Sequence, residues 1–96
     1  MKHQIKTQVY FFNESEGGRN TPFGSGFNPK IKFDGSVEEL FTSLVLEDDE
    51  VIFSGDNVKL KLIVKGASEF YLYQGASFEL FEGDKKIGEG SVLLVE

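Results

Sequence analysis

Apolar and polar residues alternate along several short stretches of this chain. In residues 4–12, the side chains that share one face are Ile5, Thr7, Val9 and Phe11. A period of two is typical of a β-strand that buries one face. The same kind of stretch recurs at residues 30–33, 50–53, 58–64, 77–82 and 85–94. The pattern predicts a strand in each of them.

Residues 36–46 fit two patterns. Their apolar positions between Val37 and Val45 have helical spacing, and Ser36 with Glu39 matches a capping box at a helix start. The residues from Leu40 to Leu46 also alternate as a strand would. We favour a strand, with a short helix as the alternative.

Glycine-rich segments separate the predicted strands. Residues 13–28 lack apolar periodicity and are expected to form a long loop. Gly55 and Asn57 suit a turn between two strands, and Gly83-Asp84 suits the tight turn of a hairpin. Six or seven short strands joined in this way indicate an all-β sandwich or barrel.

Composition limits the classes of function. The chain has 96 residues, no cysteine and a single histidine, His3. This length suits one domain, and few groups remain for nucleophilic or metal chemistry. We expect no enzyme activity, metal, cofactor or bound nucleotide. Because no stretch suits a bilayer span or a signal peptide, we expect a cytoplasmic protein that does not bind membranes.

The formal net charge of −6 argues against nonspecific binding to nucleic acid. The acidic residues 47–50 are expected to form a solvated turn. Lys59 and Lys61 alternate with apolar residues and should point out of the sheet, as should Lys30 and Lys32. If the two strands are neighbours, these lysines form a basic face suited to RNA phosphate or to an acidic partner. Otherwise they only solubilise the outer surface.

Three segments carry a family resemblance. They are Glu16-Gly17-Gly18-Arg19-Asn20-Thr21-Pro22-Phe23, the turn Gly55-Asp56-Asn57, and the hairpin around Glu82-Gly83-Asp84. In this order and spacing, the chain resembles the C-terminal β-barrel domain of elongation factor Tu, its domain III. The resemblance covers nearly the whole chain. It implies a closed six-stranded antiparallel β-barrel, with residues 1–96 as one stand-alone domain.

The resemblance also implies a candidate role in translation. In this family the barrel helps to hold aminoacyl-tRNA by its T stem, packs on the GTPase domain and contacts elongation factor Ts. Two departures weaken tRNA binding: Asp84 adds negative charge, and Asp34-Gly35-Ser36-Val37-Glu38-Glu39 replaces a threonine-bearing contact segment and adds three acids. In addition, Asn20 replaces a histidine, and Lys30 replaces a glutamine whose hydrogen bonds a lysine does not reproduce. With the lysine pattern included, the RNA-binding candidates are Arg19, Lys30, Lys59, Lys61, Glu82 and Gly83.

Protein binding is the function that we favour from the sequence. Phe70-Tyr71-Leu72-Tyr73 is an insertion relative to the family pattern, and exposed aromatic residues often mark interaction sites. An extra hairpin that buries Phe70 and Leu72 is the alternative. The candidates for contacting a still unidentified protein partner are Gly17, Gly18, Arg19, Asn20, Phe70, Tyr71 and Tyr73. The alternative functions are a translation accessory domain that contacts tRNA, and one domain of a larger translation GTPase.

Overall fold

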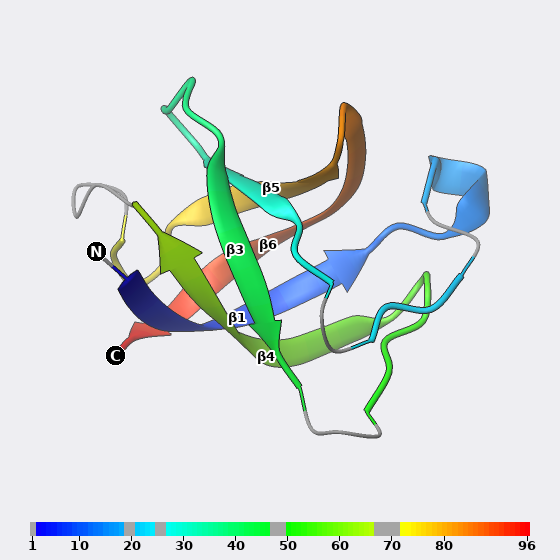
Figure 1. The fold of residues 1–96 in the computed structure, drawn as a ribbon, viewed down its shortest axis with the longest axis horizontal. Helices are drawn as coiled ribbons and strands as arrows, with labels where there is room; N and C mark the ends of the chain where they lie inside the picture. Colours follow the sequence, from blue (N-terminus) through cyan, green and yellow to red (C-terminus); the bar gives the residue numbers. More distant parts are fainter. Residues whose placement is uncertain (1, 19–20, 25–26, 47–49, 67–71) are drawn as a thin grey trace.

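Six antiparallel strands close into a barrel in the computed structural model, which describes residues 2–18, 21–24, 27–46, 50–66 and 72–96 (Figure 1). Around the barrel the strand order is β1-β4-β3-β2-β5-β6, and β6 pairs with β1 to close it. The strands are β1 (Lys2–Phe11), β2 (Lys30–Phe33), β3 (Leu40–Val45), β4 (Asn57–Lys65), β5 (Ser77–Glu82) and β6 (Lys85–Val95). The predicted six-stranded barrel is confirmed.

Alternation along each strand fills the barrel interior. On β1, Ile5, Val9 and Phe11 are fully buried, whereas the intervening residues face outward. Thr7 shares the buried face because its hydroxyl donates to the carbonyl of Leu60 at 2.9 Å. A buried hydroxyl costs stability unless it is hydrogen-bonded, and this bond meets that requirement.

The predicted strand at residues 50–53 is wrong. In the structure only Ile52 takes part in β-structure, through an isolated bridge to Phe23. Immediately afterwards the chain turns, since the Phe53 amide donates to the Asp56 carboxylate and the Asp56 amide to the Phe53 carbonyl. The alternation of buried and exposed side chains at residues 50–53 therefore comes from one bridged residue, Ile52, between two exposed neighbours, Val51 and Phe53. It does not come from a paired strand.

The strand that we favoured from the sequence for residues 36–46 is present, and the helical alternative is wrong. The strand β3 begins only at Leu40, because a turn precedes it. In that turn the Ser36 amide donates to the Phe33 carbonyl, and the Ser36 hydroxyl accepts from the Glu38 amide at 3.0 Å. The serine that resembled a helix cap thus stabilises a loop.

The loops and the chain ends lie on different sides of the barrel. Figure 1 shows the 3-10 helix η1 (Glu14–Glu16) and the β5–β6 turn at one end, with both termini close together at the other. At the loop end, the Phe23 ring packs between those of Phe11 and Phe27 in tilted contacts, with ring centroids 4.9 and 4.8 Å apart. This aromatic cluster and the Phe23–Ile52 bridge close that end of the interior.

Candidate functional site

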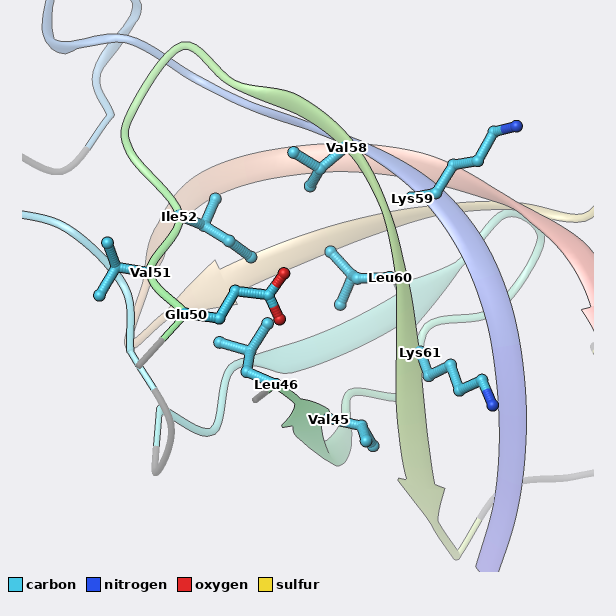
Figure 2. Close-up of a pocket in the computed structure, with 9 residues that line it drawn as sticks. All are labelled: Val45, Leu46, Glu50, Val51, Ile52, Val58, Lys59, Leu60 and Lys61. Carbon is cyan, nitrogen blue, oxygen red and sulfur yellow. The ribbon is translucent and has the colours of Figure 1, made fainter. Parts of the chain in front are cut away.

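The lysines of β4 point outward, as predicted from the sequence. Figure 2 shows Lys59 and Lys61 on one side of β4, and Val58 and Leu60 on the other. Leu60 is buried with the core, while Lys59 is exposed and Lys61 is half-buried. The alternation of the strand thus separates two cations from the barrel interior.

A third lysine joins them across the strand pair. Lys6 of β1 lies directly opposite Lys61, and Gln8 lies opposite Lys59. We call Lys6, Lys59 and Lys61 the lysine face. One carboxylate oxygen of Glu96 lies 3.9 Å from the Lys6 ammonium and 3.6 Å from that of Lys61. On the neighbouring strands, Val45 of β3 lies opposite Lys61 and Leu94 of β6 lies opposite Lys6. These two hydrophobic residues are 41% and 49% exposed.

Lys30 and Lys32 do not extend the lysine face. They lie on β2, and β3 separates that strand from β4. The basic surface that the sequence suggested therefore forms between β4 and β1 instead. Lys6 was missed in the sequence because only the register of β1 against β4 brings it beside Lys61.

A groove borders the lysine face on its inner side. It has a volume of about 680 Å³ and lies between β4 and two short stretches of chain, residues 45–46 and 50–52. Figure 2 shows Leu46, Ile52 and Leu60 pointing into it, together with the carboxylate of Glu50. The floor of the groove is consequently apolar, and the Glu50 carboxylate lies beside it.

Two of the predicted partner contacts, Gly17 and Gly18, shape the loop after β1. Gly17 ends η1 with a φ of 91°, a left-handed conformation that glycine adopts without strain. Gly18 donates its amide to the Asn13 carbonyl at 2.8 Å, and a Cβ there would lie 1.8 Å from the Phe12 carbonyl oxygen. Both positions thus have a structural need for glycine. The neighbouring candidates Arg19 and Asn20 lie outside the described residues.

The hairpin turn lies against this loop. Gly83 has a φ of 62°, which suits the first central position of a tight hairpin turn. Past the turn, the Lys85 ammonium donates to the carbonyl of Gly18 at 3.1 Å. Lys30 lies opposite Phe81, next to Glu82. The structure therefore brings four predicted RNA or partner contacts to the same end of the barrel: Gly18, Lys30, Glu82 and Gly83.

Comparison with known protein families agrees with this arrangement. Residues 1–96 match the family model described as the elongation factor Tu C-terminal domain. The chain belongs to that family. The resemblance seen in the sequence is confirmed, and the chain is a barrel domain of the translation-factor type.

The remaining partner candidates of this elongation factor Tu C-terminal domain lie elsewhere. Tyr73 is 56% exposed and precedes β5, at the end of the barrel opposite Gly17 and Gly18. Its neighbour Leu72 is buried, as the alternative interpretation of this segment expected. Phe70 and Tyr71 lie outside the described residues. The described candidates thus occupy two separate surfaces.

In the described parts of this elongation factor Tu-type barrel, two side chains of the outer face, Tyr10 and Lys86, have raised pKa values. A hydrogen bond from the Tyr10 hydroxyl to Glu16 raises the pKa of Tyr10, with smaller contributions from desolvation and the Glu16 charge. The Lys86 ammonium lies 2.6 Å from Glu79 and 3.2 Å from Glu89. These carboxylates, Glu79 foremost, raise the pKa of Lys86 against a smaller opposing effect of desolvation. Both shifts thus arise from contacts with neighbouring surface carboxylates.

Within the described ranges, no group of three or more His, Asp or Glu side chains is placed to hold a metal ion. In the same parts of the chain, no helix has the length and apolar character that crossing a bilayer would require.

Proposed function

We propose that this elongation factor Tu-type barrel is a non-catalytic module that binds an acidic surface of a protein partner through the lysine face. One observation carries the proposal. Lys6, Lys59 and Lys61 lie together on adjacent strands of a chain whose net charge is −6. Segregation of positive charge on an acidic molecule orients an acidic partner and accelerates its association.

The apolar neighbours of the lysine face favour protein over nucleic acid. Val45 and Leu94 are exposed on the same outer surface. Protein interfaces combine an apolar centre with polar and charged residues at the rim. Phosphate backbones, by contrast, are held mainly by cations and hydrogen-bond donors. The surface therefore suits a partner that offers both carboxylates and apolar side chains.

A contact with the T stem of tRNA is the second candidate. It is supported by the bond from Lys85 to Gly18, which places the Gly83 turn against the loop after β1, with Lys30 nearby. Glu82 and Asp84 are exposed in this region and would repel phosphate. We rank this candidate below protein binding for that reason.

The test is affinity capture from the native cell lysate with the tagged chain, with and without RNase. A matched pair of charge reversals identifies the surface. Lys59→Glu with Lys61→Glu changes the lysine face, whereas Lys30→Glu with Lys32→Glu makes the same change in net charge on β2. We expect an RNase-resistant protein whose recovery falls about tenfold only with the first pair, as for loss of close interfacial charges.

Two outcomes would contradict protein binding at the lysine face. Recovery of tRNA that disappears with RNase would favour the second candidate instead. Equal losses with the two variant pairs would show that net charge, and not the lysine face, controls capture. Thermal unfolding of each variant verifies that the barrel remains folded.

A further inference from the structure

A bulge in β6 turns two neighbouring leucines onto the outer surface of the barrel. Lys6 lies opposite Leu94 and Thr7 lies opposite Val92, so Leu93 stands between the two pairs as an extra residue. Val92 is buried, and strict alternation would bury Leu94 as well. Because an extra residue in one strand re-aims the side chains beside it, Leu93 and Leu94 are both exposed instead.

Leu93 borders a hollow on the lysine face, which we call the Leu93 hollow. It has a volume of about 220 Å³. The residues that line it are Lys6, Thr7, Lys59, Leu60, Lys61 and Leu93. The side chains of Thr7 and Leu60 are buried in the barrel interior, so the walls on the outer surface come from Leu93 and the three lysines.

The Leu93 hollow combines apolar walls with a positively charged rim. The stem of a lysine is a chain of methylene groups, whereas its ammonium group stays in water. Leu93 and the lysine stems therefore offer apolar contacts, with the ammonium groups around them. Of the described residues that line the hollow, three are lysines and none is acidic. The Leu93 hollow thus suits an apolar group that has negative charge beside it.

Glu96 shows that a carboxylate fits at this rim. One of its oxygens lies 3.6 Å from the Lys61 ammonium and 3.9 Å from that of Lys6. Its other oxygen accepts a hydrogen bond from the side-chain amide of Gln4 at 2.5 Å. A single carboxylate does not neutralise three ammonium groups, so the rim keeps an excess of positive charge. Further carboxylates, from a partner, are therefore attracted to it.

The size of the Leu93 hollow favours a side chain over a free small molecule. Pockets for drug-sized ligands usually have volumes of about 300–1,000 Å³ and enclose most of the ligand. The hollow is smaller, at about 220 Å³, and lies on the outer surface. Protein interfaces commonly seat one side chain of the partner in a central pocket with near-neutral contacts around it. The Leu93 hollow matches this second arrangement.

We propose that the Leu93 hollow receives one aliphatic side chain from an acidic segment of the partner, whose neighbouring carboxylates contact Lys6, Lys59 and Lys61. This inference rests on the protein-binding function proposed above and names the part of the partner that is recognised. The carboxylates orient the segment by long-range attraction. The aliphatic side chain adds affinity by burying apolar surface against Leu93. An acidic segment without an apolar residue gains only the first contribution, so Leu93 determines specificity.

A synthetic peptide tests the proposal. The probe is a blocked five-residue peptide with a central leucine and two aspartates on each side, titrated against the isotope-labelled 96-residue chain and followed by NMR. We expect the methyl signals of Leu93 to shift on binding. Serine in place of the central leucine should raise the dissociation constant about fivefold or more, as truncation of an interface contact does. Equal affinity of the leucine and serine peptides would overturn the proposal.

Two leucine variants locate the contact. Leu93→Ala removes one wall of the hollow, whereas Leu94→Ala changes the neighbouring exposed leucine, which does not line it. We expect the first to weaken the leucine peptide about fivefold or more and the second less than about twofold. Equal losses would show that the peptide binds elsewhere on the outer surface, and would overturn the proposal. The comparison of the two peptides uses the unaltered chain, so it does not depend on the folding of any variant.

Charge reversals verify the role of the rim. Lys59→Glu should weaken the leucine and serine peptides alike, by about tenfold, because both carry the same aspartates. Lys32→Glu on β2 makes the same change in net charge and should leave both affinities in place. Similar losses with the two variants would contradict a contact between the carboxylates and the lysine face.

The outcomes distinguish this inference from the function on which it rests. If the leucine peptide binds no better than the serine peptide while capture of a partner still depends on Lys59 and Lys61, the Leu93 hollow is refuted and protein binding through the lysine face stands. If capture is also unaffected by the charge reversals, both are refuted.

Discussion

At the scale of single residues, Gly18 shows how a family motif can have a structural cause. A side chain at this position would run into the Phe12 carbonyl oxygen, at 1.8 Å from its Cβ. Gly24, in the same loop, has no atom within 4 Å of the equivalent point. The two positions therefore form a matched pair for substitution by alanine.

We expect Gly18→Ala to lower the free energy of unfolding by about 1–3 kcal/mol, as overpacking typically does. Gly24→Ala should stay within about 0.5 kcal/mol of the parent. Chemical denaturation measures both. An unchanged stability of Gly18→Ala together with lost partner capture would instead make Gly18 a contact residue.

Tyr10 carries a prediction about alkaline pH. Its hydrogen bond to Glu16 favours the neutral phenol, so the pKa is higher in the folded than in the unfolded chain. The resulting stabilisation is present below the ordinary tyrosine pKa of about 10 and is lost as the pH rises through the folded value.

We expect Glu16→Gln to lower the pKa of Tyr10, because the charge of the acceptor is removed. The ring carbon signals of Tyr10, followed by NMR from pH 8 upward, report this value. Glu14→Gln, in the same turn of η1, is the control and should leave it in place. A similar shift with both variants would attribute the effect to general charge rather than to the hydrogen bond.

At the scale of structural elements, the Phe23–Ile52 bridge ties two long loops together. The Phe23 amide donates to the Ile52 carbonyl at 2.7 Å, and the Ile52 amide returns a bond at 2.8 Å. Phe23 is fully buried, whereas the nearby Phe53 is 55% exposed. The buried Phe23 side chain and this pair of backbone bonds therefore connect the two loops.

Replacing these two phenylalanines tests that view. Phe23→Ala should lower the free energy of unfolding by about 3–5 kcal/mol, because it leaves a cavity between Phe11 and Phe27. Phe53→Ala should change it by about 0.5 kcal/mol or less. Denaturant midpoints of the two variants provide the comparison. Equal losses would mean that the exposed ring contributes as much as the buried one.

Sequence periodicity predicted elements well where each strand has one buried face. This holds for β1 and for the β5–β6 hairpin, whose Gly83-Asp84 turn was predicted and is observed. It failed at residues 50–53, because alternation records burial and carries no information on whether a neighbouring strand exists.

At the scale of the whole molecule, the net charge was readable from the sequence but its distribution was not. Lys6 and Lys61 are far apart in the chain and meet through strand register. The predicted grouping of Lys59 and Lys61 with Lys30 and Lys32 failed because β3 lies between their strands. Surface charge in a barrel thus follows the order of strands around it, which alternation alone does not specify.

The pairing of the first strand with the last has a consequence for chain connectivity. The Glu96 amide donates to the Gln4 carbonyl at 2.9 Å, so the two ends lie side by side. A circular permutant that joins residue 96 to residue 2 through a few glycines and opens between Gly83 and Asp84 should fold and unfold cooperatively. Circular dichroism would show this, with a permutant opened between Leu62 and Ile63 as the unfolded control. The barrel would then be defined by which strands are neighbours, whatever the position at which the chain is cut.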